Sequence, residues 1–177
     1  MAFEDHVLPH RPLRQLADRL WEVTGSVNNS PLPRNMAVYR LSSGGLLLHS
    51  AIALDRATMV ELESLGEPKV LVVPCAFHRL DAAVYKERYP HLTVTCPALA
   101  RAKVEERVAV DGDMTEVLPP LGVGVLSPDG IKASEHVLEL PIEGGRVLVC
   151  ADMLFNIDHL PGIPGAVIRW ITASSGE

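Results

Sequence analysis

The stretch NMAVYRLSSGGLLLHSAIALDRATMVELESLG, residues 35–66, carries three structural signals in a row. Two β-rich runs flank Ser42-Ser43-Gly44-Gly45, a composition typical of a hairpin turn. The following residues 54–66 have the apolar spacing of an amphipathic helix and end at a glycine. We therefore predict a hairpin over residues 36–52 and a helix over residues 54–66.

Residues 70–90, VLVVPCAFHRLDAAVYKERYP, continue with an alternation of strand and helix. Residues 69–74, KVLVVP, are predicted to form a strand, because the apolar run after Lys69 is the form expected of a strand covered on both faces. A helical spacing follows over 80–90, then a strand over 92–97 and a helix over 98–108. Functional loops of α/β proteins follow strand ends, so the polar loop after Pro74 is the natural place for a site.

A second hairpin is predicted near the end of the chain. SEHVLELPIEGGRVLVCAD, residues 134–152, turns at Glu143-Gly144-Gly145 and returns through an apolar run. Before the first hairpin, residues 11–22 have the spacing of a short helix. Two hairpins that flank an alternating strand–helix centre predict an α/β fold with two mixed sheets and external helices, in a single domain over residues 1–177.

The composition limits the function classes. The chain has 16 Lys and Arg against 22 Asp and Glu, a net charge of -6, and no two basic residues are adjacent. Nucleic-acid backbones are bound by clustered basic side chains, so we expect no nucleic-acid partner. No apolar run approaches the ~20 residues of a membrane-spanning helix, and the N-terminus lacks the apolar stretch of a signal peptide. We expect no membrane association and a cytoplasmic location.

The sequence also lacks several well-known motifs. The three cysteines, Cys75, Cys96 and Cys150, form no CxxC pair, which argues against a disulfide framework or a structural zinc cluster. No GxGxxG, GxSxG or GxxxxGK[ST] occurs. The chain therefore shows no dinucleotide-binding fingerprint, no nucleophile elbow of a serine hydrolase and no P-loop.

Three strings together resemble the metallo-β-lactamase fold. The hairpin and helix of residues 35–66 look like the start of that fold, and KVLVVPCAFHRLDAA, residues 69–83, stands where the family carries its HxHxDH metal motif. GGRVLVCADMLFN, residues 144–156, resembles the strand that delivers the metal-bridging aspartate, with Ala151 where a glycine is usual. The resemblance covers residues 20–157 and implies an αβ/βα sandwich. Members of the superfamily usually continue with a further helix or strand. The sequence therefore fits two interpretations, a short branch or a chain truncated at the C-terminus.

The metal motif itself is missing. Whichever histidine of HxHxDH is matched to His78, no second histidine falls in register, so we expect no dinuclear site of that kind. The rest resembles an uncharacterised, degenerate branch of the superfamily. Its features are His49-Ser50 after the second strand, P-x-x-x-H from Pro74 to His78, Glu135 before the last hairpin, and D-x-L-F from Asp152 to Phe155. Many members of that branch have an asparagine at the position of Cys75.

A catalytic metal site needs about three protein ligands and an open position. His78 and Asp152 are the predicted metal ligands, and the pocket candidates are His49, Cys75, Asp81 and Glu135. Each has a structural interpretation as well: a histidine bonded to the backbone, a core cysteine, or an aspartate that caps a turn or helix. We predict that His49, His78 and Asp152 converge on one concave face.

Two functions follow from these residues. The loss of the metal motif favours a metal-free binding or interaction module that retains a pocket for a small molecule or a protein, with no cofactor. The alternative is a metal-dependent hydrolase with a mononuclear site that holds one zinc or another divalent metal. An unpaired strand edge near the C-terminus would favour self-association, so a homodimer is one expected partner state.

Overall fold

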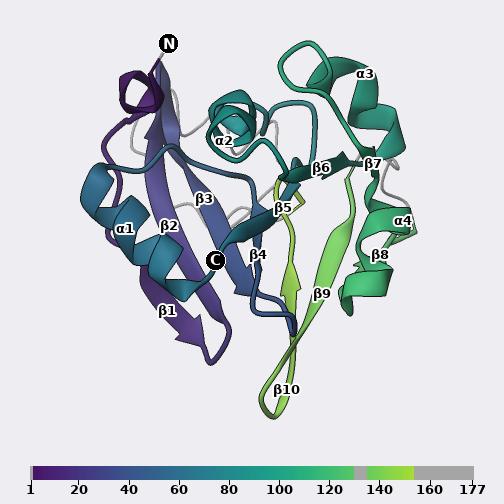
Figure 1. Cartoon of the computed structure of the whole chain (residues 1–177). Coiled ribbons are helices and arrows are strands. Elements are labelled where there is room, and N and C mark those ends of the chain that lie inside the picture. Colours follow the sequence, from purple (N-terminus) through teal and green to yellow (C-terminus); the bar gives the residue numbers. More distant parts are fainter. Residues whose placement is uncertain (1, 130–134, 154–177) are drawn as a thin grey trace, which may run out of the picture.

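Seven strands lie in one sheet and three in another, in a computed structural model that describes residues 2–129 and 135–153 (Figure 1). The strands are β1 (Arg14–Ala17), β2 (Leu20–Val27), β3 (Ser30–Arg40), β4 (Leu46–His49), β5 (Pro68–Val72), β6 (Thr93–Cys96), β7 (Gly112–Asp113), β8 (Gly124–Leu126), β9 (Val137–Ile142) and β10 (Gly145–Val149). The helices are α1 (Arg56–Leu65), α2 (Ala82–Arg88), α3 (Arg101–Val104) and α4 (Met114–Val117), with the 3-10 turns η1 (Phe3–His6), η2 (Ala98–Ala100) and η3 (Pro119–Leu121). None of the helices described here has both the length and the apolar character needed to cross a bilayer.

The larger sheet is mixed, and its strand order follows the chain from β1 to β7. Strands β1 to β4 pair antiparallel, whereas β4 to β7 pair parallel. The β3–β4 hairpin turns at the predicted Gly44, whose φ of +88° suits a residue without a side chain. Parallel neighbours need a crossover, and α1 and α2 supply it between β4, β5 and β6.

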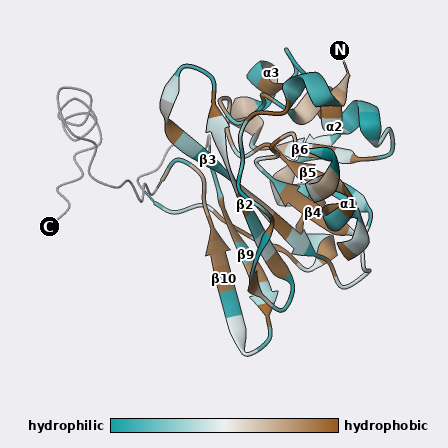
Figure 2. Cartoon of the chain, turned by 90° about the vertical axis from the view of Figure 1, so that its left-hand side faces the viewer, coloured by the Kyte–Doolittle hydropathy of each residue, from teal (hydrophilic) through white to brown (hydrophobic). Residues whose placement is uncertain are grey.

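Helices α1, α2 and α3 cover one face of this sheet, whereas α4 packs with the cluster on the other face. Asp55 caps α1 by accepting a hydrogen bond from the Thr58 backbone N–H at 2.8 Å. Met59 and Leu62 of α1 and Tyr85 of α2 are buried in a cluster with side chains from β2 to β6. In Figure 2 the ribbons of β4 and β5 are mostly hydrophobic, as expected for strands covered on both faces.

The smaller sheet covers the opposite face. Its described strands, in the order β10-β9-β8, are antiparallel, and Leu138 and Leu140 of β9 pack against a second cluster that includes Leu47 and Val72. The Tyr39 hydroxyl donates a 2.6 Å hydrogen bond to the Pro141 carbonyl and so links the two sheets. Two packed sheets with helices outside confirm the predicted fold class.

Two sequence-based predictions of local structure are wrong. Residues 11–22 form β1 and the beginning of β2, in which Arg14 pairs with Glu22, rather than a helix. The four apolar positions of this segment fit a helix or a strand equally well. The segment forms strands because β2 pairs with β3 and β1 pairs with β2. The predicted helix over 98–108 is reduced to η2 and α3, while Val104 and Val108 remain buried. The segment 156–177 lies outside the described residues.

Candidate functional site

Three segments that end strands meet beside the parallel part of the larger sheet. Strands β4 and β5 are parallel neighbours, so Ser50 and the loop from Pro74 to His78 follow their carboxyl ends on the same edge. The turn after β10 brings Asp152 from the smaller sheet. Contacts of Cys75 and His78 with Asp152 join the loop to the smaller sheet, and the contact of Ser50 with His78 joins it to the end of β4.

Asp152 lies between His78 and Cys75. Its Oδ1 is 3.0 Å from His78 Nε2, and its Oδ2 accepts a hydrogen bond from Cys75 Sγ at 3.0 Å. The hydrogen bond from His78 lowers the pKa of Asp152, against the effect of burial. Burial, followed by the bond to Asp152, raises the pKa of Cys75 to about 12. At neutral pH the carboxylate is therefore ionised, and the thiol keeps the proton that it donates.

Ser50 completes the contacts of His78. Its Oγ lies 2.5 Å from His78 Nδ1, and its backbone has a φ of +59°, which is uncommon for a residue with a side chain. The backbone N–H of Ser50 donates to the Val72 carbonyl at 3.0 Å, which anchors this conformation on β5. The sequence showed the His49-Ser50 pair but gave no sign that the hydroxyl would contact His78.

The row Ser50–His78–Asp152 has the composition of a nucleophile, a base and an orienting carboxylate. Ser50 is only 2% exposed, however, so a substrate carbonyl cannot approach its Oγ in this conformation. A buried hydroxyl can still fix which ring nitrogen carries the proton. Ser50 is therefore a positioning residue for His78.

Glu135 holds the turn that carries Asp152. Its Oε1 accepts hydrogen bonds from the backbone N–H groups of Ala151 and Asp152, both at 2.8 Å. Glu135 is buried, with 8% of its surface exposed. The Glu135 carboxylate therefore fixes the backbone of the turn and, through it, the position of Asp152. It satisfies backbone donors that the end of β10 would otherwise leave unpaired.

His49 and Asp81 lie outside this cluster. The His49 ring is buried, and burial followed by the nearby His78 lowers its pKa to about 3. Asp81 precedes α2 without making a capping hydrogen bond. Its carboxylate instead forms a buried ion pair with Arg34 and accepts the Ala53 backbone N–H at 3.0 Å. Asp81 therefore has a structural role beneath the helices.

The residues Cys75, His78 and Asp152 fit a metal ion of the zinc type. One donor atom from each of the three lies within 4.8 Å of the other two. Tetrahedral zinc with bonds of about 2.0–2.3 Å places its ligand atoms roughly 3.3–3.8 Å apart, close to the spacing in this group. A sulfur, an imidazole nitrogen and a carboxylate oxygen are all donors that zinc accepts, and three ligands leave a fourth position open.

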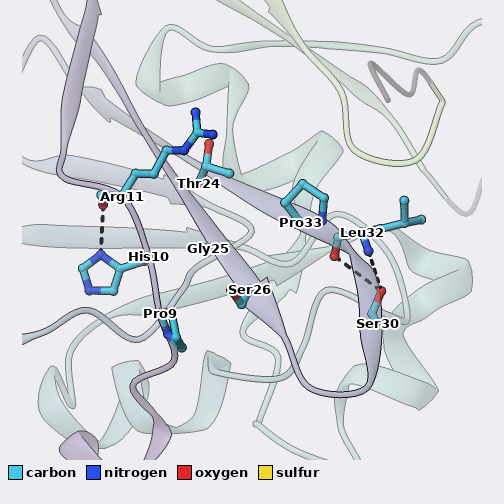
Figure 3. Close-up of a pocket in the computed structure, with 9 residues that line it drawn as sticks. All are labelled: Pro9, His10, Arg11, Thr24, Gly25, Ser26, Ser30, Leu32 and Pro33. Atoms are coloured by element: carbon cyan, nitrogen blue, oxygen red, sulfur yellow. Dashed lines mark hydrogen bonds between the residues drawn. The ribbon is translucent and has the colours of Figure 1, made fainter. Parts of the chain in front are cut away.

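A pocket lies on the surface away from the Cys75–His78–Asp152 group. It has a volume of about 410 Å³ and is bordered by Pro9–Arg11 and by residues of β2 and β3 (Figure 3). His10 contributes no free polar atom, because its Nδ1 bonds to the Arg11 carbonyl and its Nε2 accepts the Asp55 backbone N–H, both at 2.9 Å. This pocket shares no lining residue with the Cys75–His78–Asp152 group.

Comparison with known proteins supports the fold. No protein-family model and no curated protein matches the chain. Among solved structures, it is similar to the metallo-β-lactamase FIM-1 from Pseudomonas aeruginosa in a mono-zinc form, with a TM-score of 0.56 and 12% identity over 75% of this chain and 65% of that one. It is also similar to a metallo-β-lactamase from Erythrobacter litoralis, with a TM-score of 0.57 and 14% identity over 71% of this chain and 64% of that one.

A third similar structure is the DIM-1 metallo-β-lactamase exposed to ceftazidime, with a TM-score of 0.55 and 14% identity over 75% of this chain and 65% of that one. The chain thus spans slightly less than two thirds of the length of these proteins. At such low identity the likeness concerns the fold. The chain has the metallo-β-lactamase fold, as the sequence predicted, and it presents a Cys/His/Asp group in place of the HxHxDH motif.

Proposed function

We propose that this chain binds one zinc-type divalent ion through Cys75, His78 and Asp152, and that it acts as a metal-dependent hydrolase. The observation that carries the proposal is the convergence of three different donor atoms within 4.8 Å. Cys75 and His78 lie three residues apart in the loop after β5, whereas Asp152 follows β10 of the other sheet, 77 and 74 residues away, so local packing alone does not require it to meet them.

The surrounding residues suit this role. A histidine that binds a metal through Nε2 usually donates its Nδ1–H to a fixed partner, and Ser50 Oγ lies at that nitrogen. Glu135 fixes the backbone of Asp152. Cys75 must become a thiolate to be a ligand, so its proton would be released to solvent when the ion binds, and Asp152 would stay ionised as the third ligand. When bound, such an ion would supply Lewis acidity and an activated water.

The mono-zinc form of FIM-1 supports a single-ion site in a protein of similar fold. The missing HxHxDH motif argues against a second ion in this chain. The competing function is the metal-free binding module, because the three side chains also satisfy one another by hydrogen bonds without a cation. Metal uptake therefore separates the two functions directly.

The test is elemental analysis of protein purified without chelator and then equilibrated with zinc. We expect one zinc ion per chain in the wild type and none in Cys75→Ser or His78→Gln. Cys150→Ser and His136→Gln are matched controls that keep the ion, because neither residue belongs to the group. Far-UV circular dichroism verifies that every variant is folded. A wild-type protein that takes up no zinc, or two ions per chain, would contradict the proposal.

Hydrolysis is tested on the zinc-loaded protein with a carboxylic ester and a phosphodiester that release a chromophore. We expect turnover that EDTA removes and zinc restores, and no turnover in His78→Gln. Turnover that survives EDTA would point to another nucleophile. Ser50→Ala should weaken zinc binding by about 10–100-fold, the usual effect of losing a partner behind a metal-binding histidine.

A further inference from the structure

Three exposed apolar side chains lie at the edge of the larger sheet that holds Cys75 and His78. They are Phe77, Leu80 and Leu99, which together we call the apolar rim. Phe77 lies between the two proposed ligands in sequence and is 81% exposed. Single exposed apolar side chains are normal on protein surfaces, whereas neighbouring ones indicate a binding surface.

Two loops form the apolar rim, and side-chain contacts join them. Phe77 and Leu80 belong to the loop after β5, and Leu99 belongs to η2, which follows the carboxyl end of β6. Strands β5 and β6 are parallel neighbours, so both loops leave the same edge of the sheet. The guanidinium of Arg79, in the first loop, donates to the Glu106 carboxylate at 2.8 Å and so ties this loop to the segment after α3.

The charges that the described loops bring to the apolar rim are balanced. Arg79 is paired with Glu106. In the loaded metal site, the two positive charges of the ion would be matched by the Cys75 thiolate and the Asp152 carboxylate, while a metal-bound His78 is neutral. An anionic substrate would therefore lose its hydration without meeting an opposite charge. This balance favours a neutral substrate.

We infer that the apolar rim binds the acyl chain of a neutral carboxylic ester whose carbonyl lies at the ion. The inference rests on the metal site of the proposed function and names its substrate class. Hydrolysis of such an ester adds one water, whose hydroxyl joins the acyl carbon as the bond to the alcohol oxygen breaks, and the alcohol leaves with a proton. No further reactant is needed.

The test compares two zinc-chelating probes on the zinc-loaded wild-type protein, acetohydroxamic acid and hexanohydroxamic acid. Both have the same chelating group, and only the second has an alkyl chain long enough to reach the apolar rim. We expect hexanohydroxamic acid to bind about tenfold more tightly in calorimetric titrations, because a chain that lies on an open surface buries only part of its apolar area. Nuclear Overhauser contacts should join this chain to the Phe77 ring.

Variants of the rim test which residues carry the preference. Phe77→Ser and Leu80→Ser should each reduce it to about threefold or less and leave the affinity for acetohydroxamic acid unchanged. Val60→Ser is the matched control, because Val60 is also an exposed apolar residue but lies on α1, which packs on the face of the sheet. Its preference should stay about tenfold.

Equal affinities of the two probes for the zinc-loaded wild type would overturn the inference, and so would a phosphodiester cleaved as fast as an ester. A wild-type protein that dimerises in analytical ultracentrifugation, while Phe77→Ser stays monomeric, would show that a second copy of the chain covers the rim instead. A protein that takes up no zinc would contradict the proposed function together with this inference. Zinc uptake with equal probe affinities would contradict the inference alone.

Discussion

Arg34 and Asp81 form an ion pair in which the two side chains are only 8% and 6% exposed. Such a pair is costly to desolvate, and its net contribution to stability is small. Removing one partner is different, because the other charge then stays buried without compensation. Asp81 additionally accepts the Ala53 backbone N–H, so it connects β3, the segment after β4 and the start of α2.

Asp81→Ala should therefore lower the free energy of unfolding by about 3–5 kcal/mol, measured by urea denaturation. Replacing Arg34 by Met in the same protein should recover much of that loss, because it removes the orphaned charge. Lys103→Ala, in an exposed pair with Glu106, is the control and should change the midpoint little. Equal effects of Asp81→Ala and Lys103→Ala would contradict the assignment of a buried pair.

His49 makes the stability of the protein depend on pH. Its pKa falls from 6.5 to about 3 on folding, mainly through burial. Below pH 6.5 the unfolded chain takes up a proton that the folded protein refuses, so stability is lost as the pH falls through this window. From pH 7 to pH 5 the loss should be about 2 kcal/mol. In His49→Phe this part of the slope should vanish, whereas an unchanged slope in urea titrations would show that the ring is not buried.

Part of the candidate site could be predicted from sequence. His78 and Asp152 each follow an apolar strand, which is a local signal, and the fold resemblance implied that those strand ends share a rim. The contact of Ser50 with His78 depends on a left-handed backbone at Ser50, which no local pattern reveals. The support of Asp152 by Glu135 and the pairing of Asp81 with Arg34 likewise depend on residues distant in sequence.

At the scale of secondary-structure elements, Gly66 joins α1 to β5. Its φ of +154° and ψ of 173° belong to a region that essentially only glycine adopts. A Cβ at this position would lie 2.3 Å from the Gly44 carbonyl oxygen, in the turn of the first hairpin. The end of the helix and the hairpin turn therefore pack backbone against backbone.

Gly66→Ala should destabilise the protein by at least about 1–3 kcal/mol, because strain and a clash with a backbone atom add together. Gly144→Ala has a φ of +79° but open space around it, so it measures strain without a clash. Gly145→Ala has neither feature and should be close to neutral. Urea midpoints that do not follow the order Gly145, Gly144, Gly66 would contradict this account.

The hairpins were the most predictable elements, because Gly44-Gly45 and Gly144-Gly145 interrupt runs of β-forming residues. The segment 11–22 was misassigned because four apolar positions in twelve residues fit both periods. Its identity as a strand comes from pairing with the rest of the sheet, as in the contact of Arg14 with Glu22. The short helix α3 shows the same limit, since good helix formers extend well beyond its end at Val104.

For the molecule as a whole, β4 is one of the strands that contribute side chains to both clusters. Leu47 faces the smaller sheet and Leu48 faces the helices, and both are at most 1% exposed. Leu47→Ala and Leu48→Ala should each cost about 2–5 kcal/mol. Because the same strands serve both faces, unfolding should remain a single transition by circular dichroism and by fluorescence in either variant. Two separate transitions would show that the two clusters unfold independently.

The strand order of the larger sheet has a consequence for synthesis on the ribosome. Each strand from β2 to β7 pairs with the one made just before it, so this sheet can assemble while the chain emerges. The contact of His78 with Asp152 forms later, because Asp152 is synthesised 74 residues after His78. At about 5–20 residues per second, synthesis of that stretch takes roughly 4–15 s. During those seconds the apolar face that β8 to β10 later cover is open to other nascent chains. A slow translation step after β7 would lengthen the exposure, so this is the interval in which a chaperone would matter most.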